Sequence, residues 1–144
     1  MRLVLKTLML FAVVGAQAAP PPFEKWEILA ESVQGQSIAF DRSSLHRVGD
    51  LLTLTVLANF SPPREFDGRP LHSYVSQEAI DCRLKRYAIL EAAGFSERDG
   101  RGEVVGREPL VTIESAKWTT PKPMSVGQEK IGQICQAVFG VPIT

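Results

Sequence analysis

Several stretches of the chain alternate apolar and polar residues with the two-residue period of β-strands. The clearest are residues 23–32, 37–41, 50–60 and 73–90, with shorter candidates at 103–105 and 110–113. The first two flank a turn at 33–36, which favours a hairpin. The stretch 50–60 carries apolar side chains on both faces, so we expect a central strand that is covered at least partly on each side.

The last element is predicted to be an α-helix that begins after Ser125. Ser125 and Gln128 form a capping-box pattern, in which the serine caps the helix and the glutamine reaches back to it. The apolar residues that follow have helical spacing: Ile131, Ile134, Cys135, Val138 and Phe139. Gly140 and Pro142 are typical of a helix end. Strands followed by one helix predict a small domain of the α+β class.

The segments between these elements carry turn-forming residues. We expect a single helical turn at 41–45, because the Asp41 side chain can accept hydrogen bonds from N–H groups two or three residues on. Residues 61–72 are rich in proline and glycine and predict a long exposed connection. Residues 98–102 predict a turn, and their two glycines do not match a nucleotide-binding loop.

The first 18 residues have the layout of a secretory signal peptide, with cleavage expected between Ala18 and Ala19. A positively charged start precedes an apolar run at 7–14 and then small residues. The run is shorter than the ~20 residues that a membrane-spanning helix needs, and no cysteine follows it to carry a lipid. We therefore expect an exported protein, periplasmic or secreted, with no membrane span or lipid anchor.

The rest of the chain has the size of one domain. Residues 19–22 are expected to form an extended leader, and residues 23–144 the domain. The whole chain has 16 basic and 16 acidic residues. Removal of the signal takes away two basic residues, so the mature chain is slightly acidic. This balance argues against a nucleic-acid-binding protein.

The two cysteines, Cys82 and Cys135, are expected to form one disulfide, as is usual in an exported chain. Within 73–90, one side of the alternation is the expected core face: Ile80, Cys82, Leu84, Ala88 and Leu90. Cys135 lies on the apolar face of the expected helix, so both sulfurs point inward. A metal pair or a catalytic thiol are the alternatives, and two cysteines without a histidine cluster fall short of a four-ligand zinc site.

An ordered series of landmarks resembles the surface-adhesin protein E family of small exported bacterial proteins. The matching features are Trp26, Asp41-Arg42-Ser43-Ser44-Leu45, Val56-Leu57-Ala58-Asn59-Phe60, Pro62, Ser73, Ile80-Asp81-Cys82-Arg83, Gly100-Arg101-Gly102-Glu103-Val104-Val105, Trp118 and Cys135. The resemblance implies a single antiparallel sheet of about six strands with a C-terminal helix packed on one face and tied by Cys82–Cys135. It also implies a non-enzymatic binding protein, with host matrix or serum proteins as partners.

Two groups of residues are candidates for the partner-binding surface. The first lies in the expected connection: Arg64, Phe66, Arg69 and His72. The second is the basic, aromatic face of the following strand: Arg83, Lys85 and Tyr87. Solvated loop and sheet surfaces are the plainer interpretation of both groups. An exposed edge strand could also pair two copies into a homodimer.

Two other function classes remain open at this stage. A periplasmic protein that binds a hydrophobic or haem-like ligand could use His46, His72 and Met124. A hydrolase is disfavoured because no nucleophile-elbow pattern is present. We expect no catalytic residues, no bound metal and no cofactor.

Overall fold

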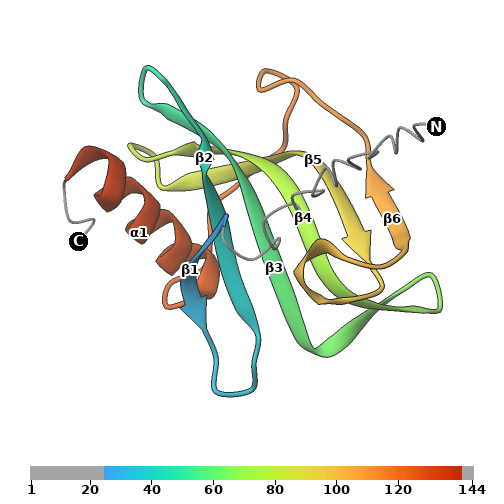
Figure 1. The fold of residues 1–144 in the computed structure, drawn as a ribbon. Helices are drawn as coiled ribbons and strands as arrows, with labels where there is room; N and C mark the ends of the chain where they lie inside the picture. Colours follow the sequence, from blue (N-terminus) through green and yellow to red (C-terminus); the bar gives the residue numbers. More distant parts are fainter. Residues whose placement is uncertain (1–24, 141–144) are drawn as a thin grey trace, which may run out of the picture.

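The structure is a computed structural model that describes residues 25–140, and Figure 1 shows its fold. The strands are β1 (Trp26–Glu31), β2 (Ser37–Val48), β3 (Leu51–Phe66), β4 (Arg69–Asp81), β5 (Arg86–Phe95), β6 (Val104–Glu108) and β7 (Trp118–Thr119). The helices are the 3-10 turn η1 (Arg98–Gly100) and α1 (Val126–Phe139). The expected signal peptide, its Ala18–Ala19 cleavage point and the leader at 19–22 lie outside the described residues. No helix within 25–140 is long and apolar enough to cross a membrane.

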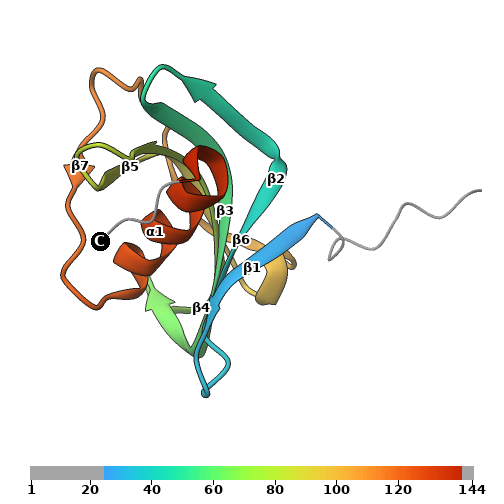
Figure 2. The same cartoon turned by 90° about the vertical axis from the view of Figure 1, so that its left-hand side faces the viewer.

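The strands form one antiparallel sheet, in which β1 to β6 are neighbours in chain order. β7 pairs with the first part of β5, and β6 pairs with its last part. The sheet curls, and α1 lies against its concave face (Figure 2). The predicted α+β fold, with a single sheet and a C-terminal helix, is confirmed, as is the central position of β3.

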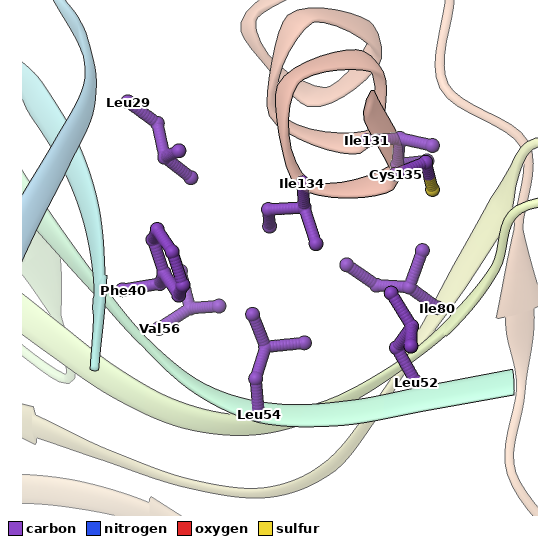
Figure 3. Close-up of a cluster of buried hydrophobic side chains, with 9 residues drawn as sticks. All are labelled: Leu29, Phe40, Leu52, Leu54, Val56, Ile80, Ile131, Ile134 and Cys135. Atoms are coloured by element: carbon purple, nitrogen blue, oxygen red, sulfur yellow. The ribbon is translucent and has the colours of Figure 1, made fainter. Parts of the chain in front are cut away.

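The main core fills the space between α1 and the concave face (Figure 3). It consists of Leu29, Phe40, Leu52, Leu54, Val56, Ile80, Ile131, Ile134 and Cys135. Alternate residues of β3 point inward here, while the helical spacing of α1 brings its apolar stripe onto them. On β1 the inward residue is Leu29, and Ile28 is 62% exposed. A register shift between Ile28 and Ala30 in the β1–β2 pairing determines which β1 side chain points inward.

The capping pattern of α1 is present with one change. Ser125 Oγ accepts a hydrogen bond from the Gln128 N–H at 3.3 Å. The Gln128 side chain reaches back to the Met124 N–H at 2.6 Å, one residue before the expected partner. Gly140 closes the helix with a φ of 67°, a left-handed conformation that glycine adopts without strain.

The disulfide between Cys82 and Cys135 is confirmed, and it joins the end of β4 to α1 with a Cα–Cα distance of 5.8 Å. The single alternating stretch at 73–90 is wrong, because β4 ends at Asp81 and β5 starts at Arg86. Asp81 Oδ1 accepts a hydrogen bond from the Leu84 N–H at 3.0 Å, and Lys85 has a φ of 52°. These features turn the chain without glycine or proline, and they leave Leu84 48% exposed instead of in the core.

The long exposed connection expected at 61–72 is also wrong. β3 continues to Phe66, and only Asp67 and Gly68 separate it from β4. The register shifts between Asn59 and Arg64. Pairing with β2 ends at Asn59, so the prolines in this part of β3 stand where one side of the strand needs no ladder hydrogen bond.

Two smaller predictions, a helical turn at 41–45 and a strand at 110–113, are also wrong. Residues 41–45 are not a helical turn but an irregular part of β2, between the pairs Asp41–Thr55 and His46–Thr53. The predicted side-chain bond does form, since Asp41 Oδ1 accepts from the Ser43 N–H at 3.0 Å. Residues 110–113 form no strand; one backbone hydrogen bond, from Val111 N–H to Leu90 O at 2.8 Å, holds them near β5.

The loop after β5 is fastened to the opposite face of the sheet by a polar cluster around Asn59. Its side-chain amide donates to Ser37 Oγ at 3.2 Å and to Asp99 Oδ1 at 3.0 Å. Its carbonyl accepts from the Asp99 N–H at 2.8 Å. Ser73 Oγ adds a bond to Glu97 O at 2.5 Å and accepts from the Gly100 N–H at 2.9 Å. The turn predicted at 98–102 is therefore confirmed, and it covers this face.

Candidate functional site

A pocket lies beside the N-terminal half of α1, where the helix leaves part of the concave face uncovered. The 14 residues of α1 span ~21 Å, whereas the 16 residues of β3 reach ~50 Å. The helix therefore cannot cover the whole sheet. The space that remains has a volume of about 490 Å³. This is within the size range of small-molecule sites.

The pocket floor carries a buried ion pair between β4 and α1. Lys130 Nζ lies 2.5 Å from Glu78 Oε2, and the two side chains are 6% and 5% exposed. Ser76 Oγ donates to the other carboxylate oxygen of Glu78 at 2.9 Å. The ammonium also lies 4.1 Å from the centre of the Tyr87 ring. Both charges are thus compensated, as burial requires.

Sequence reasoning missed this pair, although its signals are present. Lys130 precedes Ile134 by four residues, so it lies on the same face of α1 as the apolar stripe. Glu78 precedes Ile80 by two residues, so it takes an inward position of β4. Each of these inward positions carries a charged residue, and the two charges have opposite signs. This pattern could have identified the pair from the sequence.

The pocket walls are mostly apolar and include two tyrosines. The apolar residues are Ala30, Ile38, Val56, Ala58, Phe60, Ile89 and Val126. Burial raises the pKa of Tyr74 well above its usual range, and a hydrogen bond to Glu108 adds to the shift. Burial also raises the pKa of Tyr87, with a further contribution from Glu78. Both hydroxyls are therefore neutral and able to donate at physiological pH.

Arg64 and Glu129 stand at the edge of the pocket as exposed charges. The Arg64 guanidinium lies over the Phe60 ring, 4.3 Å from its centre. Glu129 Oε1 accepts a hydrogen bond from the Gln133 side chain at 3.1 Å. Within residues 25–140 neither charge has an ion-pair partner.

The structure divides the predicted surface residues between two ends of the sheet. Arg64, Phe66, Arg69 and His72 gather at the β3–β4 turn. Arg83 and Lys85 lie in the β4–β5 turn, at the other end of the 13-residue strand β4, a separation of ~40 Å. Tyr87 belongs to neither end and lines the pocket.

Contacts at the β3–β4 turn hold it against β6. The Arg69 guanidinium donates to the Val105 carbonyl. Phe66 packs over Gly106, where a Cβ would lie 2.5 Å from the ring, and it remains 49% exposed. His72 Nδ1 is buried and has no hydrogen-bond partner in the described part of the chain.

The residues proposed for a haem-like ligand do not gather at the pocket. His46 lies on β2 and His72 on β4, and Met124 is 99% exposed. None of the three lines the pocket. In residues 25–140 no group of three or more His, Cys, Asp or Glu side chains is placed to hold a metal ion.

The fold is similar to solved structures of protein E from Haemophilus influenzae. Crystal form II matches with a TM-score of 0.60 and 14% identity, over 88% of this chain and 100% of that chain. The selenomethionine form matches with 0.56 and 13%, over 83% and 93%. The protein from a non-typeable strain matches with 0.53 and 15%, over 87% and 85%.

At these identities the likeness concerns the fold, and no curated protein sequence matches the chain. The family model described as "Surface-adhesin protein E" matches residues 26–136, which span β1 and most of α1. The chain therefore belongs to the surface-adhesin protein E family.

Proposed function

We propose that this protein is an exported, adhesin-like binding protein that recognises a protein partner and catalyses no reaction. The observation that carries the proposal is the family match over residues 26–136, together with the shared fold. The proposed partners are host matrix or serum proteins, and the proposed location is the periplasm or the outside of the cell. A disulfide-tied domain suits this setting, because such bonds persist in oxidising compartments.

We assign the partner contact to the β3–β4 tip, which we define as Arg64, Phe66, Arg69 and His72. Phe66 is 49% exposed, although aromatic residues of its size usually bury more of their surface. Arginine and aromatic side chains are the residues that most often dominate protein–protein binding energy. The glycine beneath Phe66 and the bond from Arg69 to Val105 hold this surface in place before binding.

The β4–β5 turn, with Arg83 and Lys85, is the second candidate surface. Both side chains are exposed, and they lie far from the first surface. Because the two surfaces are at opposite ends of β4, single substitutions test them separately.

A panel of immobilised matrix and serum proteins, measured by surface plasmon resonance, tests the proposal. We expect saturable binding to at least one, and a loss of roughly thirty-fold in affinity for Phe66→Ala if Phe66 is a dominant contact. Arg83→Glu reports on the second surface, and Lys117→Glu, an exposed charge reversal outside both surfaces, is the matched control. Saturable binding that both Phe66→Ala and Arg83→Glu leave unchanged would move the contact elsewhere. The absence of saturable binding across the panel would contradict adhesion.

A further inference from the structure

The pocket beside α1 offers hydrogen-bond donors on Lys130 and Arg64, whereas its buried carboxylate has no oxygen to spare. Glu78 is the carboxylate on its floor, and both of its oxygens are engaged, one by Lys130 and one by Ser76. Glu31 is among the residues around the pocket, but its cross-strand partner is Ser37, which bonds Asn59 on the other face of the sheet. Cross-strand partners share a face, so the Glu31 side chain belongs to that other face.

Lys130 supplies one of the unused donors. An ammonium group has three N–H bonds and no acceptor. One N–H bonds Glu78, and the Tyr87 ring takes up part of the remaining positive charge. A ligand oxygen that reached the floor would find a further N–H of a side chain that is 6% exposed.

Arg64 supplies the other donors. Its guanidinium carries five N–H groups in a planar fork that matches a carboxylate. The ring of Phe60 holds the group at 4.3 Å, over the apolar wall. An apolar ligand with an anionic end could therefore pack on Phe60, Ala58 and Val56 and present its charge to Arg64.

We propose that the pocket binds an apolar carboxylate, with the apolar part between α1 and the concave face and the carboxylate at Arg64. The same chemistry is found in a fatty acid and in a protein segment with an apolar residue beside an acidic one. The proposal goes beyond adhesion at the β3–β4 tip, because a protein that adheres without using the pocket would still have this site.

The test is a two-dimensional NMR titration of the folded protein with sodium decanoate, and with 1-decanol and decylammonium as probes of equal chain length. We expect decanoate to shift the signals of pocket residues saturably and to bind more tightly than either analogue. Arg64→Gln should weaken decanoate binding about five-fold, which is the upper range for one exposed ion pair, and leave decanol unchanged. Glu129→Gln should strengthen decanoate binding slightly by removing a like charge.

The control variant is Lys117→Glu, which should bind decanoate as the unmodified protein does. Equal binding of decanoate and decanol, an Arg64→Gln variant with unchanged decanoate affinity, or no shifts at the pocket would each overturn the proposal. A second arm compares N-acetyl-leucyl-leucyl-glutamate amide with its glutamine analogue and with decanoate. A glutamate peptide that binds more tightly than both favours a protein segment as the natural source, and weaker binding than decanoate favours a fatty acid. Loss of decanoate binding with intact matrix binding would remove this inference and leave the proposed function standing.

Discussion

Lys130 and Glu78 form an ion pair at 2.5 Å, and this pair fastens α1 to β4 at a second point besides the disulfide. The disulfide joins Cys82, which directly follows β4 and lies four residues after Glu78, to Cys135 of α1, five residues after Lys130. Two attachments prevent the helix from pivoting about one. The two attachments therefore hold α1 beside the uncovered part of the concave face that forms the pocket.

Removal of one member of the buried pair should destabilise the protein strongly. Lys130→Met leaves the Glu78 carboxylate buried without its cation, which costs about 3–5 kcal/mol of unfolding free energy. Urea unfolding measures the change. The double variant Lys130→Met with Glu78→Leu should lose much less than the sum of the single losses, because no uncompensated charge remains.

The matched control for this prediction is the exposed pair Arg42–Glu27, at 2.7 Å. Arg42→Met should change the unfolding midpoint little, since solvent screens this pair. Additive losses in the Lys130 and Glu78 double variant would mean that the buried pair contributes no coupling.

Loss of the disulfide should be comparably severe. The bond spans 53 residues of sequence, and a chain-entropy estimate for such a loop gives about 4 kcal/mol. The variant Cys82→Ala with Cys135→Ala should show this loss in urea unfolding. Unchanged stability would imply that the ion pair and the core alone keep α1 in place.

The alkaline stability limit should depend on the two tyrosines, the only ones in the chain. Burial raises the pKa of both Tyr74 and Tyr87. A raised folded-state pKa stabilises the fold below the unfolded-state pKa of roughly 10, and that stability is lost as pH rises through the folded-state pKa. Ultraviolet titration of the folded protein should therefore show little tyrosinate at pH values where the urea-unfolded protein is largely ionised.

Tyr87→Phe provides the check, because it keeps the ring beside Lys130 and removes the ionisable group. Its stability should fall less steeply above roughly pH 10 than that of the unmodified protein. Coincident titration of folded and unfolded tyrosines would contradict the described burial.

Asn59 should be the critical residue for the loop that contains η1. Asn59→Ala removes three hydrogen bonds, to Ser37 Oγ, Asp99 Oδ1 and the Asp99 N–H. Groups that are left buried without partners cost about 1–3 kcal/mol. Hydrogen exchange should rise at Asp99 and Gly100 while the core of β3 remains protected. Protection at Asp99 equal to that of the unmodified protein would show that Ser73 holds the loop alone.

The spacing of apolar residues predicted the elements that bury a regular apolar face. The helix was predictable because Ile131, Ile134 and Cys135 repeat at its spacing, and β3 because both of its faces are apolar. The β3–β4 hairpin was not predictable, because Pro62, Pro63 and Gly68 are typical loop residues. The sequence alone does not show that β2 stops pairing with β3 before these prolines. A strand whose one side is unpaired accepts proline, and the β2–β3 pairing, which ends at Asn59, is what reveals that side.

The candidate site was less predictable than the fold. Of the residues predicted for the partner-binding surface, two line the pocket: Tyr87 inside it and Arg64 at its edge. The pocket exists because α1 is shorter than β3, a relationship between elements that no local pattern contains. The pairing of Lys130 with Glu78 joins residues 52 apart in sequence and depends on the same packing.

A substitution that fills the pocket is the most direct test of whether it is a binding site. Ala58 lies on its wall, and Ala93, half-buried beside a smaller hollow on the opposite face of the sheet, is the matched position. Isothermal titration with decanoate should show that Ala58→Trp abolishes binding in a protein with an unchanged circular dichroism spectrum, and that Ala93→Trp binds normally. Normal decanoate binding by a folded Ala58→Trp variant would contradict the claim that the uncovered part of the concave face is a binding site.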